Sequence, residues 1–213
     1  MSYPTYQVYE KIYSRFLLKG PEIFFSKQSP KGLVVTDLCS GGGIVTRYAL
    51  SHGAIHVNMV ENEEKMMPKD LVENNRTTWF GRDVEYFLKE MDTDRADIIT
   101  CRQGVNYWLK HVDTKNIAKK LVKGGMFVFN TFGNKPPERP KVREYFHGGR
   151  AYCEVSYCVG DVVHHIQAVD GFEPHVTSFD WLSDEFIREK LNSHFDCEVS
   201  VDKASSMWYC IAK

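Results

Sequence analysis

The sequence predicts an α/β protein: a doubly wound, mostly parallel seven-stranded sheet that ends in an antiparallel C-terminal hairpin. Short apolar, β-branched runs alternate with helical patterns between residues 33 and 132, which is typical of strands joined by helices. Residues 195–213 predict the closing hairpin. Residues 151–181 predict an inserted antiparallel β layer over the active site, because Gly160-Asp161 separates two β-rich runs.

Composition excludes several classes of protein. The 213 residues are enough for one α/β domain over residues 1–213, and 27 Lys+Arg against 28 Asp+Glu give no field that would favour nucleic acid. No apolar run approaches the roughly 18 residues of a membrane span, and the N-terminus lacks the basic and apolar regions of a signal peptide. We therefore expect a cytoplasmic protein that has no membrane partner and for which a nucleic-acid partner is disfavoured.

The six cysteines are scattered, without the paired C-x-x-C spacing of a zinc site. They are Cys39, Cys101, Cys153, Cys158, Cys197 and Cys210. Free cysteines most often behave as small apolar residues inside a core. We therefore expect neither a bound metal nor a disulfide.

A glycine-rich turn follows the first predicted strand and opens the next helix. Residues 33–43 read Leu-Val-Val-Thr-Asp-Leu-Cys-Ser-Gly-Gly-Gly. Glycines here let the chain pass close to a ligand, and the N–H groups of the helix start face it. A dinucleotide fingerprint would need a glycine in place of Thr46, and no Gly-Lys-Ser/Thr follows for a phosphate loop. Asp37 before the turn suits a cationic ligand better than a pyrophosphate; the alternative is a turn that binds nothing.

Two acids follow the next two predicted strands. Glu61 follows residues 55–60, twenty residues after Gly41, where a carboxylate can accept hydrogen bonds from both hydroxyls of a ribose. The alternative is an acid favoured by the dipole of the following helix. Asp83 follows the third strand. The alternative to a ligand-binding role is that Asp83 caps the next helix. We expect Pro68 to interrupt the helix between these strands.

The fourth predicted strand, residues 96–101, leads to the segment where ligands should meet, because open α/β sheets bind ligands outside the carboxyl ends of their strands. Two stretches resemble motifs of class I S-adenosylmethionine (SAM)-dependent methyltransferases: Asp37-x-Cys39-x-Gly41-x-Gly43 and the segment that ends in Asn106-Tyr107. The resemblance covers nearly the whole chain and implies a Rossmann-like fold.

The resemblance implies a SAM site along the first four strands. Asp37 would lie near the methionine amino group, Glu61 would hold the ribose, and Asp83 would accept from the adenine amino group. The cofactor-binding residues that it implies are Asp37, Cys39, Gly41, Gly43, Glu61, Asn62, Asp83, Val84, Cys101 and Gln103. Asn106 and Tyr107 would meet the substrate; alternatively, they only pack the following helix.

The resemblance also implies covers over the site. Residues 1–30 would form an N-terminal lid helix, but their aromatic residues at helical spacing equally fit a helix on the edge of the core. Residues 151–181 would cap the site or form a homodimer. His164 and His165 point to opposite faces because strand side chains alternate, and we choose His165 as a catalytic candidate, with His175 as a further one.

The implied function is in-line transfer of the SAM methyl group to nitrogen, oxygen or sulfur of a small-molecule acceptor, with S-adenosylhomocysteine as the product. No general base is evident from the sequence. Two alternatives remain open: a methyltransferase of protein or RNA, favoured by the cationic segment 133–150, and a non-catalytic SAM-binding protein. Methylation of base amino groups is disfavoured, because Arg102-Gln103-Gly104-Val105 stands where such enzymes carry a Pro-Pro-aromatic motif.

Overall fold

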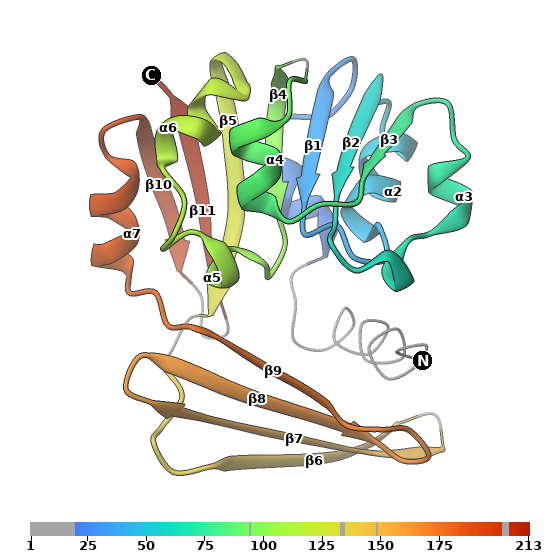
Figure 1. Ribbon diagram of the computed structural model, residues 1–213, viewed down its shortest axis with the longest axis vertical. Helices are drawn as coiled ribbons and strands as arrows, with labels where there is room; N and C mark the ends of the chain where they lie inside the picture. The colour runs from blue at the N-terminus through green and yellow to red at the C-terminus, as the bar shows by residue number, and fades with distance from the viewer. Residues whose placement is uncertain (1–19, 94, 133–134, 148, 202–204) are drawn as a thin grey trace.

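Two separate β sheets build the molecule, with the smaller sheet beyond the carboxyl ends of the parallel strands in the larger one (Figure 1). The computed structural model describes residues 20–93, 95–132, 135–147, 149–201 and 205–213. The larger sheet has seven strands in the order β10-β11-β5-β4-β1-β2-β3, and the smaller has four in the order β6-β7-β8-β9. We call the smaller one, β6 to β9, the cap sheet.

The larger sheet confirms the predicted fold class. Its parallel strands are β1 (Val34–Leu38), β2 (His56–Val60), β3 (Thr77–Phe80), β4 (Ala96–Cys101) and β5 (Leu121–Phe132). At its edge, β11 (Ser205–Ala212) runs antiparallel to β5, and β10 (Phe195–Val201) runs antiparallel to β11.

Helices cover both faces of this sheet. One face packs against η1 (Pro21–Phe25), α2 (Ile44–Ser51) and α3 (Lys69–Val72). The other packs against α4 (Val84–Glu90), α5 (Val105–Trp108), α6 (Thr114–Lys119) and α7 (Asp184–Leu191). A short turn, η2 (Glu64–Met66), precedes α3, which restarts directly after Pro68 as expected.

Strand alternation divides the core between these two faces. In β5, Phe127 and Phe129 pack with the helices α4 to α7, whereas Met126 and Val128 pack with η1 and α2. Because both faces are buried, the strands are almost continuously apolar, which is typical of parallel sheets. The carboxyl ends of β1, β2 and β4 are therefore held firmly and can position side chains for a site.

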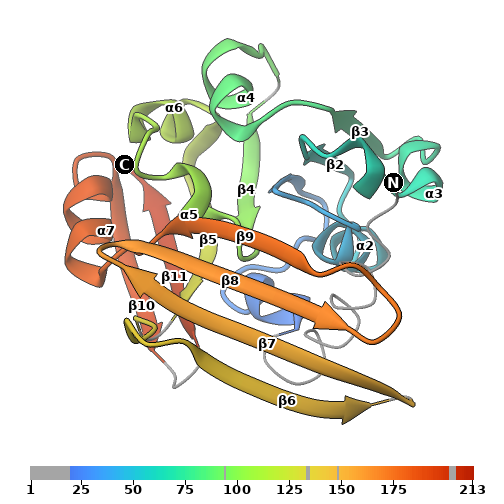
Figure 2. The ribbon, with the colours of Figure 1, turned by 60° about the horizontal axis from the view of Figure 1, so that its bottom comes forward.

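The cap sheet contains β6 (Lys141–His147), β7 (Arg150–Val159), β8 (Val162–Val169) and β9 (His175–Asp180), all antiparallel (Figure 2). The hairpin at Gly160-Asp161 agrees with the prediction. Strand β6 does not, because we expected an irregular cationic segment over residues 133–150 and a cap that began at residue 151. The Gly-Gly pair at positions 148 and 149 is a two-residue hairpin signal that the proline-rich and charged composition obscured.

Two further expectations need comment. Cys197 and Cys210 lie directly opposite each other on β10 and β11 and form a disulfide, which the sequence analysis did not expect. The lid helix predicted over residues 1–30 lies outside the described residues up to residue 19, and residues 21–25 form the 3-10 helix η1.

Candidate active site

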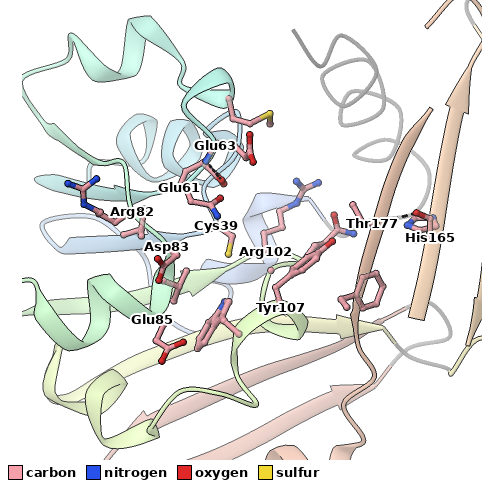
Figure 3. A pocket seen from close by; sticks show the side chains of 18 of the residues that line it. Cys39, Glu61, Glu63, Arg82, Asp83, Glu85, Arg102, Tyr107, His165 and Thr177 are labelled. Atoms are coloured by element: carbon pink, nitrogen blue, oxygen red, sulfur yellow. Dashed lines mark hydrogen bonds between the residues drawn. The ribbon is translucent and has the colours of Figure 1, made fainter. Parts of the chain in front are cut away.

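A cavity of about 620 Å³ lies between the carboxyl ends of the parallel strands and the cap sheet (Figure 3). One wall comes from the turns after β1 to β4 and from α5, and the other from β8 and β9. The predicted site residues that line it are Cys39, Glu61, Asn62, Asp83, Val84, Gln103, Tyr107 and His165. Those that lie outside the lining are Asp37, Gly41, Gly43, Cys101 and Asn106.

Glu61 reaches the cavity from the end of β2 and organises the turns beside it. One carboxylate oxygen accepts from the backbone N–H of Gly41 at 3.0 Å, and the other accepts from the backbone N–H of Glu63 at 3.0 Å. Partial burial raises the pKa of Glu61, while these backbone hydrogen bonds act in the opposite direction. The glycine turn and the loop after β2 are thus fastened to a single carboxylate.

Asp37 points into the protein rather than into the cavity. Its carboxylate is fully enclosed and accepts from the hydroxyls of Thr46 on α2, at 2.8 Å, and Thr100 on β4, at 3.0 Å. Burial raises the pKa of Asp37 to about 6, and the two threonine hydrogen bonds oppose that rise. In this geometry Asp37 joins β1, α2 and β4 beneath the glycine turn.

The glycine turn itself depends on left-handed backbone at Gly41 and Gly43, with φ of 51° and 77°. A Cβ on Gly43 would overlap the side chain of Leu71 in α3, so this position needs a glycine for space as well as for conformation. Gly41 contributes its N–H to Glu61. Both glycines shape the turn from outside the cavity.

Asp83 has two roles, one in capping a helix and one in lining the cavity. Its side chain accepts from the backbone N–H of Tyr86 at 2.7 Å and so caps α4, as one of the two readings of the sequence proposed. It also lines the cavity, next to Val84 in the chain and on the same side as Glu61 (Figure 3). The hydrogen bond that caps α4 uses Oδ1 of Asp83. The same side chain therefore caps the helix and lines the cavity.

Two cysteine sulfurs meet at the floor of the cavity, one in the lining and one beneath it. Cys39, after β1, lines the cavity and lies against Cys101 at the end of β4, and a hydrogen bond to Cys101 together with burial raises the pKa of the Cys39 thiol. Cys101 is fully buried. Cys39 and Gln103 are the non-glycine residues with positive φ in the described chain, at 53° and 59°. The Gln103 backbone N–H donates to Asn130 at 2.9 Å, which holds the turn after β4.

Helix α5 connects the large sheet to the cap sheet. Asn106 is 1% exposed and donates its side-chain amide to the backbone carbonyl of Asp180 in β9 at 2.9 Å. The ring of Tyr107 meets Phe179 of β9 edge to face, with ring centroids 5.4 Å apart. Lys110 adds an ion pair with Asp180 at 3.1 Å. Asn106 therefore anchors the cap, whereas Tyr107 belongs to the lining.

The inner face of the cap carries a buried histidine–glutamate pair. His165 Nε2 and Glu154 Oε1 are 2.7 Å apart, and both side chains are almost fully enclosed. His164 lies on the outer face, where it contacts Ser178 at 2.9 Å. His165 rather than His164 therefore reaches the cavity, on the side opposite Glu61 and Asp83 (Figure 3).

A second cap histidine, His175 of β9, also lines the cavity. Burial and the neighbouring His165 lower the pKa of His175, and Glu63 from the loop after β2 acts in the opposite direction. Glu63 and His175 thus face each other from opposite walls. The cap and the loop that Glu61 fastens come close at this point.

The sequence analysis did not identify Arg102, Glu154, Gln167 or Thr177 as site residues. Period-2 alternation could have found Gln167 and Thr177, because they share strand faces with His165 and His175. Glu154 depends on the pairing of β7 with β8, which no local pattern specifies. In the parts of the chain that the structure describes, no group of three or more His, Cys, Asp or Glu residues could hold a metal.

Comparison with solved structures identifies the fold. A methyltransferase from Clostridium acetobutylicum that depends on SAM matches with a TM-score of 0.76 at 14% identity, over 97% of this chain and 98% of that one. The sugar N-methyltransferase KedS8 from Streptoalloteichus matches with a TM-score of 0.69 at 15% identity, over 98% and 92%. SAM-bound CalS10, an amino pentose methyltransferase from Micromonospora echinaspora, matches with a TM-score of 0.70 at 14% identity, over 95% and 96%.

The protein has the fold of class I SAM-dependent methyltransferases, as its sheet order and these matches show together. Neither a family model nor a curated protein matches it in sequence. Within the described residues, no helix has both the length and the apolar character that crossing a membrane requires.

Proposed function

We propose that this protein is a SAM-dependent methyltransferase that acts on a small polar molecule. The observation that carries the proposal is the unequal distribution of charge around one cavity. Among the described lining residues, every acid comes from the strand side, where Glu61, Glu63, Asp83 and Glu85 outnumber Arg82 and Arg102. The cap side contributes hydrogen-bonding groups without a carboxylate: His165, Gln167, His175 and Thr177. A cationic donor is favoured on one side, and a polar acceptor on the other.

The residues on the strand side fit SAM. Glu61 can accept from ribose hydroxyls, because a carboxylate has about four acceptor positions and only two are used by Gly41 and Glu63. Asp83 and Val84 border the region expected for adenine. Asp37 would act indirectly, by holding the glycine turn, rather than by contacting the methionine end. Bound SAM supplies an electrophilic methyl group on a sulfonium, which leaves as a neutral thioether.

The size and closure of the cavity favour a small acceptor. About 620 Å³ falls within the range of roughly 300–1,000 Å³ typical of small-molecule sites. The cap would exclude water and hold the acceptor in line with the methyl group, which is where most of the acceleration should arise. The cations that favoured an RNA substrate are partly engaged, since Lys135 pairs with Asp161 at 2.8 Å.

The outer face of the cap suggests that two copies associate. It exposes apolar side chains from all four strands, among them Val142, Phe146 and Val159, at 56%, 74% and 63% exposure. An antiparallel sheet with an apolar outer face usually packs against another layer. A homodimer with its two-fold axis at this face would bury these side chains without blocking the cavity on the inner face.

Calorimetry tests the proposal directly. We expect SAM and S-adenosylhomocysteine to bind with micromolar affinity and nicotinamide dinucleotides not to bind. Incubation with methyl-labelled SAM and a low-molecular-weight cell extract should then yield a labelled small product, identified by mass spectrometry. Failure of both SAM and S-adenosylhomocysteine to bind would overturn the proposal. Label found only in protein or RNA would replace the small acceptor with a macromolecule.

A further inference from the structure

The pair of Glu154 and His165 is unusual for the inner face of a small sheet. Glu154 is 5% exposed and His165 is 8% exposed, yet they meet at 2.7 Å. Burying a carboxylate beside an ionisable ring is costly, and a fully apolar pair would often stabilise a sheet more. The cap could have used apolar residues here, as it does with Cys158, Val163 and Phe179 farther along the sheet. The pair therefore calls for a chemical explanation.

We propose that Glu154 positions His165 as the general base of the methyl transfer, and that the acceptor nucleophile is an amine, hydroxyl or thiol that must lose a proton. This inference rests on the proposed function and names the chemical class of its acceptor. A nucleophile with no proton to lose, such as a thioether or a pyridine-type nitrogen, would have no use for the pair.

The geometry fixes which ring nitrogen takes the proton. A carboxylate only accepts hydrogen bonds, so the neutral ring of His165 carries its proton on Nε2, facing Glu154. Nδ1 is then the basic atom. The acceptor X–H gives its proton to Nδ1, the X lone pair forms the X–CH₃ bond, and the S–CH₃ bond breaks with its electron pair moving to sulfur. The imidazolium that results is stabilised by the Glu154 carboxylate, in the arrangement of nucleophile, base and orienting acid that many hydrolases share.

Other histidines near the cavity are less suited to this role. His111 lines the cavity but pairs with Asp180 at 3.4 Å, and its side chain is 58% exposed. His175 faces Glu63, a carboxylate on the strand side. The groups around His165 are Glu154 from β7 and His175 and Thr177 from β9, with Tyr107 on the opposite wall. Of these, Glu154 alone is a buried acid in direct contact with the ring.

Nitrogen NMR of histidine-labelled protein tests the positioning without any acceptor. In the wild type, we expect His165 to be the Nε2–H tautomer, assigned by loss of its signals in His165→Gln. Glu154→Leu should give a mixture of tautomers, because the acceptor is lost. Glu154→Gln should keep the Nε2–H tautomer, because the amide oxygen still accepts, and it guards against a variant that simply unfolds. Glu144→Gln, at an exposed position on β6 of the same sheet, should change nothing.

Turnover with the labelled cell extract and SAM tests the base. His165→Gln should slow product formation by roughly 10²–10⁴-fold, with SAM affinity unchanged. Glu154→Gln should slow it at least about tenfold at unchanged KM, because a neutral amide no longer stabilises the positive charge that the ring gains during the methyl transfer. His164→Gln, the outward neighbour, should retain wild-type turnover.

The outcomes separate the two proposals. Failure of the wild type to bind SAM would overturn the proposal that the protein is a methyltransferase. Normal SAM binding with an Nδ1–H tautomer, or a tautomer indifferent to Glu154→Leu, would overturn only the role of Glu154. Full turnover in His165→Gln, or a methylated product formed at a nucleophile that never carried a proton, would overturn the acceptor class. If the extract supplies no acceptor, the NMR result decides the positioning alone.

Discussion

The sulfur of Cys39 lies where a side chain on Gly104 would begin. A Cβ on Gly104 would overlap Cys39 and approach the sulfur of Cys101 to 3.1 Å. The backbone at Gly104 has φ of −105°, which any residue can adopt, so the requirement is one of space. The turns after β1 and β4 are therefore packed against each other at the floor of the cavity, and neither can change size alone.

Gly104→Ala should consequently destabilise the protein by about 1–3 kcal/mol through overpacking. Cys39→Gly removes the obstructing atoms, so the cost of Gly104→Ala should largely vanish in that background. A double-mutant cycle from urea unfolding measures this coupling. Gly124→Ala is the control, since Gly124 has φ of 74° with open space around it and should show no coupling to Cys39. Equal costs in both backgrounds would contradict the packing explanation.

Glu61→Ala should weaken SAM binding by about 1–3 kcal/mol, because a charged acceptor for the ribose would be lost. Part of the effect would come from releasing the N–H groups of Gly41 and Glu63. Calorimetry provides the measurement. Glu64→Ala, at an exposed position outside the cavity lining, should bind SAM like the wild type. Unchanged affinity in Glu61→Ala would remove the ribose assignment.

Asp37 should make stability depend on pH. Its folded-state pKa of about 6 lies above the ordinary 3.8, so its contribution to stability is complete below pH 3.8 and is lost as the pH rises through 6. The difference corresponds to about 3 kcal/mol as an upper value. Asp37→Asn cannot ionise. The free energy of unfolding of this variant should therefore rise relative to that of the wild type between pH 4 and pH 7.

Urea unfolding at several pH values measures that gain. Asp196→Asn, whose carboxylate is 78% exposed, serves as the control and should show no comparable trend. The difference in free energy of unfolding between Asp37→Asn and the wild type could instead stay constant over this range. That result would show that the environment of Asp37 does not oppose its charge.

Asn106→Ala should loosen the cap without loosening the large sheet. The substitution removes the hydrogen bond to the Asp180 carbonyl, at an expected cost of about 1–3 kcal/mol. Hydrogen exchange should therefore accelerate in β9 and leave β1 protected. Asn116→Ala on α6 is the matched control. Uniform acceleration across both sheets would mean that Asn106 supports the whole core rather than the cap.

Phe146→Glu should separate the proposed homodimer. Phe146 is 74% exposed on the outer face of the cap, and a charge there would oppose apolar contact between two copies. Light scattering coupled to size exclusion gives the mass. We expect a dimer for the wild type and a monomer for the variant, while Glu90→Gln, at an exposed position on α4 outside the cap, should leave the mass unchanged. A monomeric wild type would contradict the proposed dimer.

The large sheet could be predicted because its signals are local. Buried parallel strands are largely apolar, as in residues 126–132, which follow Gly124-Gly125, and each helix between the strands carries its own pattern. Strand β6 was missed because Pro136, Pro137 and Pro140 precede it and because charged residues, Lys141, Arg143 and Glu144, fill much of its first half without a regular alternation. The Cys197–Cys210 disulfide depends on strand register, which spacing along the chain does not reveal.

The sequence predicted the strand side of the candidate site better than the cap side. Glu61 and Asp83 follow strands whose carboxyl ends must meet at one edge, so their presence at the cavity could be anticipated. Asp37 also follows this rule by position, but Thr46 and Thr100 draw its side chain inward. Glu154 could not be anticipated, since its partner lies on another strand and only long-range pairing joins them.

All four strands of the cap come from one uninterrupted stretch of chain between β5 and α7. Under the proposed function, the surface that recognises the acceptor is therefore encoded as a cassette with two junctions. Recombination at those junctions would change which molecule receives the methyl group and leave the donor machinery intact. Exchange of this one segment would let related proteins methylate different acceptors, and it marks the two junctions at which a different cap could be grafted.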